Sequence, residues 1–257
     1  MITPSRIAGP SVTLPEYAID PGPEFAPGFA RQILSTVRSV VDRDPSTFDA
    51  LDVGSGYGYT SAELARSCRS VVGIEPSPEL HASALRLLET SQVTNLVYRQ
   101  QSIYELTDRD LYDLVVLDNV LEHLPDQGEA LRRISDAMRP GACLYILVPN
   151  KLWPVEHHYS LPFLGWLPLP IANRYLRLSG RGQSYAEASY APTVGRLRRL
   201  LRQRRELRWQ FALPADISLA QCGGSTLYRA GVGAIRRWPA LWWISKALLV
   251  VAVKEGQ

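Results

Sequence analysis

Histidine side chains mark two places in this sequence where a proton could be moved or a metal ion bound. His123 follows the acid Glu122, and His157 and His158 are adjacent to each other. Imidazole titrates near neutral pH, so His157 or His158 is a candidate general base that removes a proton from a substrate. His123 is a third catalytic candidate, or else a structural histidine packed against a sheet. The alternative is a divalent metal site, with the candidate ligands Asn119, Glu122, His123 and His158.

We favour the base over the metal ion. Asn119 contributes no negative charge, and hard cations such as Mg²⁺ prefer carboxylate ligands. The expectation is therefore a catalytic imidazole with no required metal, and a divalent ion is kept as the less favoured alternative.

A glycine-rich stretch, LDVGSGYGYT, spans residues 51–60 and contains Gly54, Gly56 and Gly58. The dinucleotide fingerprint is G-x-G-x-x-G, and here the third glycine comes one residue early. The lysine of a phosphate-binding loop is also missing. Glu75 follows 17 residues after Gly58. An acid at this distance can accept hydrogen bonds from ribose hydroxyls and repels a 2′-phosphate, so the stretch favours a nucleoside without phosphates.

Strands and helices must alternate to bring these residues together. Apolar runs predict strands at 48–53, 70–75, 95–100, 112–118 and 142–149, with later strands at 206–213 and 247–255. Helical spacing predicts helices at 26–41, 60–68, 76–91, 128–141 and 193–204, with Ser77 as an N-cap and a glycine stop after the fourth. This order predicts a doubly wound α/β sheet, whose ligands bind at the carboxyl ends of the strands.

The chain is expected to form one domain over 26–257 after an irregular, Pro- and Gly-rich arm at 1–25. An insertion at 150–191 follows the fifth strand and is rich in aromatic and proline residues. A long segment at this place is typical of a functional loop, so we expect it to cap the substrate pocket. The aromatic side chains proposed to enclose the substrate are Trp153, Tyr159, Phe163 and Trp166.

The motifs ALDVGSGYGYT, VVGIEPS and YDLVVLDNVLEHLPD together resemble the class I S-adenosylmethionine-dependent methyltransferases, strongly over 26–150 and more loosely beyond. The loop after the fourth strand is similar to that of ubiquinone-pathway O-methyltransferases. The resemblance implies a Rossmann-like, seven-stranded sheet with a reversed last strand. It also implies the cofactor S-adenosyl-L-methionine, converted to S-adenosyl-L-homocysteine.

The family pattern implies a set of cofactor-binding positions in this chain. They are Asp52, Gly54, Ser55, Gly56, Gly58, Glu75, Pro76, Ser102, Ile103, Asp118 and Asn119. Asp52 would lie near the ligand's ammonium group or order the glycine loop through its backbone N–H groups. Ser102 stands where these enzymes often carry an acid for the adenine amino group. Ile103 would pack on the adenine or simply in the core.

The resemblance also bears on the reaction. Asn119, Glu122 and His123 resemble the Glu-x-x-Glu-His metal motif of small-RNA 2′-O-methyltransferases, except that the first acid is an asparagine. The implied activity is methyl transfer to a small or lipid-linked acceptor, preferably at a hydroxyl. A carbon or nitrogen acceptor, a non-catalytic S-adenosylmethionine-binding protein and an NAD-dependent dehydrogenase remain as alternatives.

Composition disfavours some classes of partner but does not identify the acceptor. The acceptor could be a sugar, an aromatic compound or a lipid-linked molecule. The net charge of +3 and the lack of an RNA-binding motif disfavour nucleic acid. The three cysteines are scattered, which fits a cytoplasmic protein. The apolar run 240–253 is too short to span a bilayer. Arginines at 196–208 and Trp238, Trp242 and Trp243 are compatible with peripheral membrane contact, although a solvated basic helix is the simpler reading.

Overall fold

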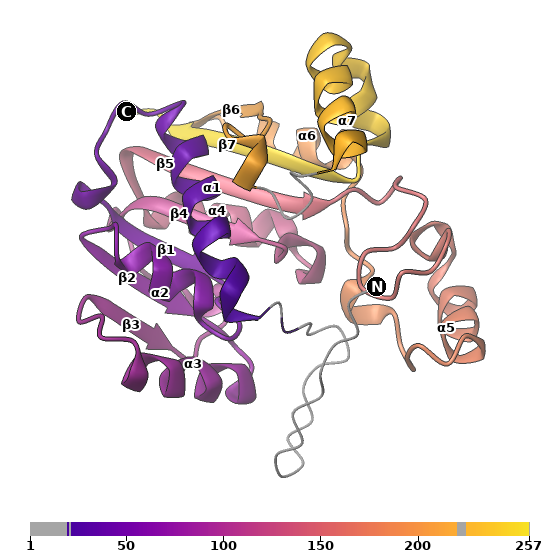
Figure 1. Ribbon diagram of the computed structural model, residues 1–257, viewed down its shortest axis with the longest axis horizontal. Coiled ribbons are helices and arrows are strands. Elements are labelled where there is room, and N and C mark those ends of the chain that lie inside the picture. Colours follow the sequence, from indigo (N-terminus) through magenta and orange to yellow (C-terminus); the bar gives the residue numbers. More distant parts are fainter. Residues whose placement is uncertain (1–19, 21, 220–224, 257) are drawn as a thin grey trace.

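The computed structural model describes residue 20 and residues 22–219 and 225–256, which form a seven-stranded sheet with helices on both faces (Figure 1). The strand order is β3-β2-β1-β4-β5-β7-β6. The strands are β1 (Asp49–Val53), β2 (Ser70–Ile74), β3 (Leu96–Arg99), β4 (Tyr112–Asp118), β5 (Met138–Pro149), β6 (Leu207–Phe211) and β7 (Ala247–Lys254). The first five are parallel, and β7 runs antiparallel to both of its neighbours. The predicted doubly wound sheet with a reversed last strand is confirmed.

Two apolar layers hold the helices to the sheet. The helices are α1 (Ala26–Arg38), α2 (Tyr59–Ala65), α3 (Pro78–Thr90), α4 (Gln127–Ala137), α5 (Leu169–Leu178), α6 (Val194–Arg202) and α7 (Thr226–Arg237). Helices α4 and α6 pack with Val115 and Leu117 on one face, and α1, α2 and α3 pack with Leu114 and Val116 on the other. Successive side chains of a strand point to opposite faces, so β4 is apolar throughout because both of its faces are covered.

Most predicted elements begin and end within a few residues of their expected positions, and Ser77 does cap α3 by accepting from the Leu80 N–H. The predicted helix over 128–141 is wrong at its end, because α4 stops at Ala137 and β5 begins at Met138. Pro140 disfavours a helical conformation at the residue before it. Gly141 lies within β5 at a φ of +78° and therefore does not cap the helix.

The insertion at 150–191 forms a small core of its own around Tyr159, Leu164 and Leu176, and it contains the unpredicted helix α5 (Figure 1). Helix α7 was not predicted either. Most of the arm at 1–25 lies outside the described residues, and its last three residues form the 3₁₀ turn η1 (Pro23–Phe25). No helix of the described chain is both long and apolar enough to cross a bilayer.

Candidate cofactor and acceptor site

A cavity of about 530 Å³ lies at the carboxyl ends of β1, β2 and β4. All of the predicted cofactor positions border it except Gly58, which forms the N-cap of α2. The cavity also takes in residues that local sequence patterns did not single out, among them Phe29, Tyr57, Tyr59 and Gln101. Phe29 belongs to α1. The size suits a single small-molecule ligand.

The loop after β1 is held open by its glycines. Gly54 and Ser55 donate their N–H groups to the Ile74 carbonyl at 2.8 and 3.0 Å, which fastens the loop to the end of β2. Gly54, Gly56 and Gly58 have positive φ angles, which side chains rarely tolerate. A Cβ on Gly56 would meet only the Gly54 carbonyl, at 4.0 Å. The backbone at Gly56 is therefore bare toward the cavity and allows a ligand to approach closely.

Glu75 orders this loop, whereas Asp52 is bonded to the following helix α2. The Glu75 carboxylate accepts from the Gly56 N–H at 3.0 Å and from the Ser77 N–H at 2.9 Å. Asp52 accepts from the Ser61 hydroxyl at 2.5 Å. The suggestion that Asp52 orders the loop through its N–H groups is therefore wrong, because the chain uses Glu75 for this task. Carboxylate oxygens have further lone pairs, so Glu75 can still accept from a diol.

Three carboxyl groups, Asp52, Glu75 and Asp118, face the same cavity. Burial raises the pKa of Asp52 to about 6 and that of Asp118 to about 7. Repulsion from Glu75 adds to the rise at Asp52, and repulsion from Asp52 adds to the rise at Asp118. Burial also raises the pKa of Glu75. No lysine or arginine is among the described residues that line the cavity. The cavity therefore favours a cationic ligand with neutral hydroxyls and opposes phosphates.

Ser102, Ile103 and Asn119 also border the cavity. The Ser102 hydroxyl accepts from the Tyr104 N–H and caps the 3₁₀ turn η3 (Ile103–Glu105). Ile103 is buried in the main core and also borders the cavity, so both of its proposed roles are compatible. Asn119 has a φ of +55°, and its amide donates to Asp118 at 2.8 Å.

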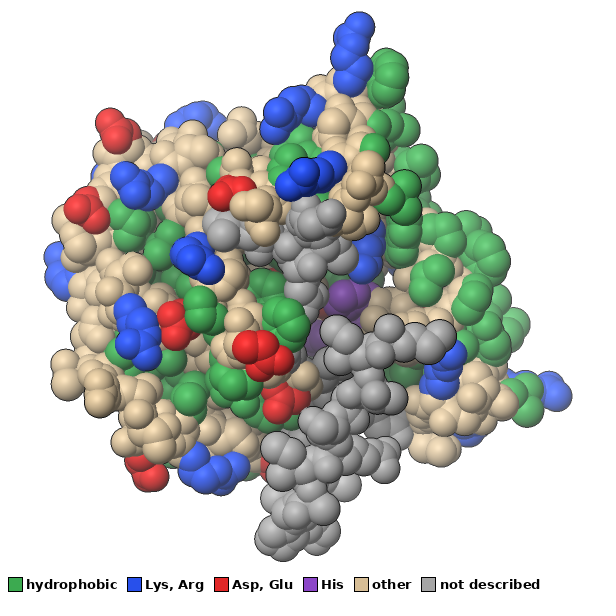
Figure 2. All heavy atoms as spheres, viewed as in Figure 1, with side chains coloured by type: hydrophobic (Ala, Val, Ile, Leu, Met, Phe, Trp, Pro, Cys, Tyr) green, Lys and Arg blue, Asp and Glu red, His purple; other side chains and the backbone are tan. Residues whose placement is uncertain are grey.

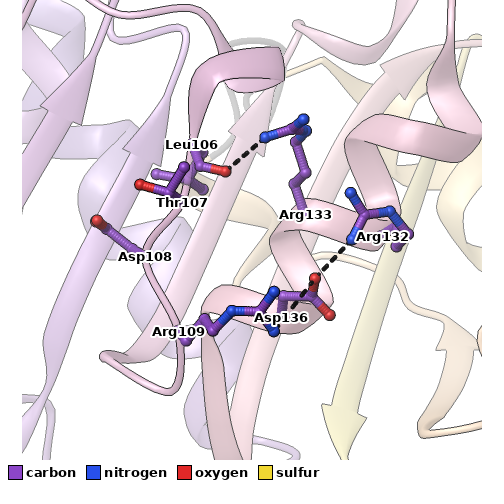
Figure 3. Close-up of a pocket in the computed structure, with 7 residues that line it drawn as sticks. All are labelled: Leu106, Thr107, Asp108, Arg109, Arg132, Arg133 and Asp136. Carbon is purple, nitrogen blue, oxygen red and sulfur yellow. Dashed lines mark hydrogen bonds and ion pairs between the residues drawn. The ribbon is translucent and has the colours of Figure 1, made fainter.

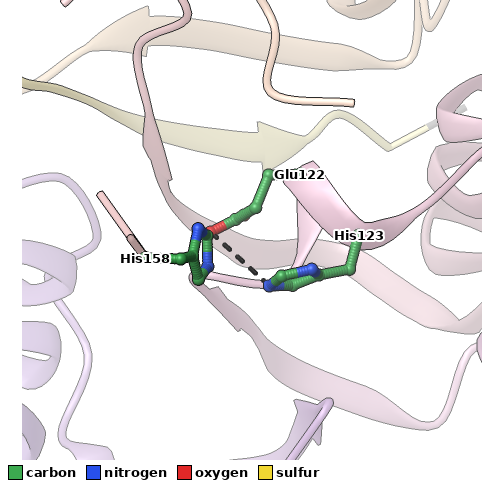
Figure 4. Close-up of side chains that lie close together, drawn as sticks. All are labelled: Glu122, His123 and His158. Carbon is green, nitrogen blue, oxygen red and sulfur yellow. Dashed lines mark ion pairs between the residues drawn. The ribbon is translucent and has the colours of Figure 1, made fainter. Parts of the chain in front are cut away.

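The three histidines of the predicted acceptor side come together beside this cavity. The rings of His123 and His158 are 5.0 Å apart, and those of His157 and His158 are 5.4 Å apart. His123 belongs to the 3₁₀ turn η4 (Leu121–His123) after β4, and the other two follow β5 in the insertion. Glu122 completes the group, because its carboxylate and one nitrogen of His123 and of His158 all lie within 4.8 Å (Figure 4).

Hydrogen bonds fix the proton positions of two imidazoles. His158 Nδ1 lies 2.9 Å from Glu156 Oε1, and His123 Nδ1 lies 2.9 Å from the Glu187 carbonyl oxygen. A carboxylate or a carbonyl oxygen only accepts, so each Nδ1 carries the hydrogen. In the neutral rings the lone pair is then on Nε2. Glu156, which sequence reasoning missed, thus orients His158, and both side chains are nearly fully buried.

Glu122 is the most unusual carboxyl group of the site. Its side chain is fully buried, and neither carboxylate oxygen has a hydrogen-bond partner among the described residues. Burial, with Asp118 and Glu156 nearby, raises its pKa to about 8. Burial also lowers the pKa of His123 to about 4. The group thus offers two imidazole nitrogens and one carboxylate that would gain from a cation between them.

The aromatic side chains of the insertion do not enclose this cavity as expected. Among the described residues, the insertion contributes only His157 and His158 to its lining. Tyr159 is buried in the insertion's own core, while Trp153, Phe163 and Trp166 are exposed. The insertion buries its apolar surface on itself, which turns the remaining aromatic rings outward.

A second hollow, of about 250 Å³, lies between α4 and the segment at 106–109 (Figure 3). Arg133 donates to the Leu106 carbonyl, Arg132 pairs with Asp136 at 2.7 Å, and Arg109 lies 4.0 Å from the same carboxylate. These charged groups already satisfy one another, so this hollow offers no comparable ligand site.

Comparison with known sequences agrees with the motifs. The family described as "Methyltransferase domain" matches residues 24–214. The ubiquinone biosynthesis O-methyltransferase of Bradyrhizobium sp. is 30% identical over 124 residues, which cover 46% of this chain and 47% of the relative. That of Aeromonas salmonicida is 36% identical over 104 residues, covering 39% and 43%. The chain thus spans less than half the length of these curated relatives.

Solved structures share the fold at low identity. An S-adenosylmethionine dependent methyltransferase from Mesorhizobium loti matches 91% of this chain and 100% of its own, with a TM-score of 0.58 and 15% identity. The plantazolicin methyltransferase BpumL, in complex with a monoazolic desmethylPZN analog and SAH, matches 91% of this chain and 85% of its own, with a TM-score of 0.57 and 14% identity. Because the family match extends over most of the described fold, the chain belongs to the methyltransferase domain family.

Proposed function

We propose that this chain transfers a methyl group from S-adenosylmethionine to a hydroxyl group of a small-molecule acceptor. The observation that carries the proposal is a cavity lined by three carboxyl groups and by no described lysine or arginine, directly beside a cluster of imidazoles. The donor has a sulfonium and an ammonium group, a ribose diol and no phosphate. It therefore matches the charge of the cavity, which NAD and ATP do not.

Different cofactor positions would bind different parts of S-adenosylmethionine. Glu75 would accept from the ribose hydroxyls, and Asp52 and Asp118 would face the positively charged part. Gly56 allows close approach of the loop, and Ile103 supplies an apolar wall. The donor supplies a methyl group activated by the adjacent sulfonium. The protein holds the reactants in line, which can contribute roughly 7–11 kcal/mol to the barrier reduction.

His158 is the residue we assign as general base. Its Nε2 carries the lone pair in the neutral ring, and Glu156 stabilises the imidazolium that forms after proton uptake. The acceptor hydroxyl gives its proton to this nitrogen while its oxygen bonds to the methyl carbon and the carbon–sulfur bond breaks. His157 is the second candidate base and His123 the third, and burial lowers the pKa of both imidazoles to about 4, which makes each a weaker base.

A bound divalent cation is a second way to activate the hydroxyl, and Glu122 is the observation that favours it. An ion held by Glu122, His123 and His158 would neutralise a buried carboxylate that has no hydrogen-bond partner. The two imidazoles already donate Nδ1–H to outer acceptors, as metal-binding histidines usually do. Asn119, the remaining candidate ligand, already donates its amide to Asp118.

One experiment separates the base from the cation. Turnover is measured as S-adenosylhomocysteine release with phenolic, sugar and lipid-linked hydroxyl acceptors, after chelation and after re-addition of Mg²⁺, Mn²⁺ or Zn²⁺. A base predicts full activity after chelation and a large loss in His158→Ala with unchanged cofactor affinity. A cation predicts activity that returns only with metal and is lost in Glu122→Gln. Wild-type rates in His157→Ala and His158→Ala, without metal, would eliminate both.

The preference for oxygen is supported by the histidine cluster and by the names of the ubiquinone biosynthesis O-methyltransferases. Carbon or nitrogen transfer would instead place the methyl group on a carbon atom or on an amine nitrogen, which fragmentation in tandem mass spectrometry distinguishes from a methyl ether. A non-catalytic binding protein would bind the donor without transfer to any acceptor. Thermal stabilisation by NAD⁺ and not by S-adenosylhomocysteine would contradict the proposal and favour a dehydrogenase.

A further inference from the structure

Charge is distributed very unevenly along this chain. Residues 1–156 contain 13 Lys and Arg and 21 Asp and Glu, a net charge of −8, whereas residues 157–257 contain 15 and 4, a net charge of +11. Helices α5, α6 and α7 contain nine arginines and no acidic residue. Such asymmetry between the two parts of a chain indicates an anionic surface as partner for the basic part.

Exposed apolar side chains are concentrated in the same part of the chain. Of the fourteen large hydrophobic residues that are exposed in the described structure, eleven follow residue 150. We define the apolar rim by six of them, three from the insertion and three from the segment that joins α7 to β7. They are Phe163 (49% exposed), Trp166 (50%), Ile171 (54%), Trp238 (60%), Trp243 (45%) and Ile244 (60%).

The two parts of the apolar rim begin at neighbouring points of the sheet. Pro149 at the end of β5 pairs with Ala247 at the start of β7. Asn150 then donates its side-chain amide to the carbonyls of Trp242, Trp243 and Ser245, at 3.2, 3.1 and 3.0 Å. These bonds tie the start of the insertion to the 3₁₀ helix η8 (Pro239–Ile244). Figure 2 shows hydrophobic side chains along this edge, over α7 and the insertion, with basic side chains beside them.

We propose that the apolar rim and the adjoining arginines form a docking surface for an anionic lipid bilayer. Tryptophan and arginine side chains are well suited to the boundary between head groups and acyl chains, where rings enter the apolar layer and cations meet phosphates. The last turn of α7 places Arg236 and Arg237 directly before Trp238. The lack of acidic residues in η8 and the three helices removes the repulsion that anionic head groups would otherwise meet.

The docking surface also bears on the acceptor. His157 and His158 line the cofactor cavity and stand in the first part of the insertion, which also carries Phe163, Trp166 and Ile171 of the apolar rim. Histidine side chains are visible in the hollow between the sheet and the insertion, on the side of the exposed apolar residues (Figure 2). A docked protein would therefore receive a membrane-held, lipid-linked hydroxyl at this histidine cluster. This last step rests on the proposed methyl transfer, whereas binding to the bilayer does not.

The test is sedimentation of the full chain with phosphatidylcholine vesicles, with and without phosphatidylglycerol. The rim variant carries Trp166→Ser, Trp238→Ser and Ile244→Ser, and its matched control carries three changes at other exposed apolar residues. The control changes are Leu85→Ser, Val97→Ser and Leu111→Ser. We expect the wild type and the control to bind only the anionic vesicles, and the rim variant to bind at least about tenfold more weakly.

A charge variant tests the second part of the surface. Arg236→Ala with Arg237→Ala should weaken binding about 30-fold, since each basic residue near an anionic surface adds about a factor of five. Arg86→Ala with Arg109→Ala is the control and should bind like the wild type. Thermal stabilisation by S-adenosylhomocysteine reports on folding and on the cofactor site in every variant.

Three results would overturn the docking surface. They are equal sedimentation of the rim variant and its control, binding that does not depend on phosphatidylglycerol, and binding to polyglutamate or single-stranded DNA as tight as to vesicles. The last result would assign the surface to a protein or nucleic-acid polyanion. A chain that binds vesicles but does not bind S-adenosylhomocysteine would keep the docking surface and refute the methyltransferase proposal.

Discussion

Binding of S-adenosylmethionine should release protons, because the cavity without ligand holds carboxyl groups at raised pKa values. Asp118 has a pKa of about 7 and Asp52 of about 6. Both values are raised mainly by burial, which penalises the ionised form. A cationic ligand favours the ionised form of both groups. Donor affinity must therefore rise with pH until both carboxyl groups are ionised before the ligand arrives.

The magnitude follows from these two values. At pH 6, Asp118 is ionised in about one molecule in ten and Asp52 in about half, if the two titrate independently. Affinity at pH 6 is then expected to be about twentyfold weaker than at pH 8.5, with about 1.4 protons released per donor bound at pH 6. S-adenosylhomocysteine has lost the sulfonium charge, so its affinity should depend less on pH.

Calorimetric titration in two buffers of different ionisation enthalpy measures both the affinity and the number of protons. Asp118→Asn should remove the larger part of the pH dependence and leave about a twofold change between pH 6 and pH 8.5. Glu89→Gln, an exposed carboxyl group on α3, is the control and should retain the wild-type profile. Affinity that is independent of pH, or proton uptake on binding, would refute the electrostatic account of the cavity.

Three further substitutions test other parts of the site. Gly58→Ala should lower the unfolding free energy, measured in urea, by more than about 1 kcal/mol. The reason is that Gly58 has a φ of +85° and that an added Cβ would overlap the side chain of Tyr98. Gly231→Ala on α7 is the control and should not destabilise the protein, because a Cβ there would lie in open space. Glu156→Gln should lower kcat about tenfold or more at unchanged donor affinity, since His158 loses the carboxylate that orients its ring; an unchanged kcat would argue against the pair. Glu122→Gln should melt higher than the wild type at pH 9 without metal, by a margin that shrinks toward pH 6, because only the wild type must ionise a buried carboxyl whose pKa is about 8.

The positions of the cofactor-binding residues could be predicted from the sequence because these residues stand at strand ends. The strand over 112–118 has the predicted bounds, so Asp118 and Asn119 had to emerge at the ligand edge. The positions of the glycines and Glu75 follow from the same rule for β1 and β2. The sequence also indicates the early end of α4, because Pro140 disfavours a helical conformation at Arg139, whereas Gly141 as a stop signal predicts a later end.

The arrangement of side chains around the proposed acceptor could not be predicted in the same way. The three histidines were correctly expected on neighbouring loops, but Glu156 was missed because its contact with His158 depends on how the loop turns. The insertion's aromatic residues were expected at the cavity, yet Tyr159 packs inside and Trp166 outside. An aromatic residue in an irregular segment has no periodicity that assigns it to a core, a pocket or a surface.

The cofactor cavity and the three helices α5, α6 and α7 carry opposite charges, so each favours a different kind of partner. The cavity gathers Asp52, Glu75 and Asp118 and suits a cation, while α5, α6 and α7 carry only basic charges and suit an anionic surface. At physiological salt the Debye length is about 8 Å, so the exposed arginines act on head groups close to them and are largely screened from the cavity. The small net charge of +3 is therefore the sum of two large and separate charges, and it conceals both binding preferences.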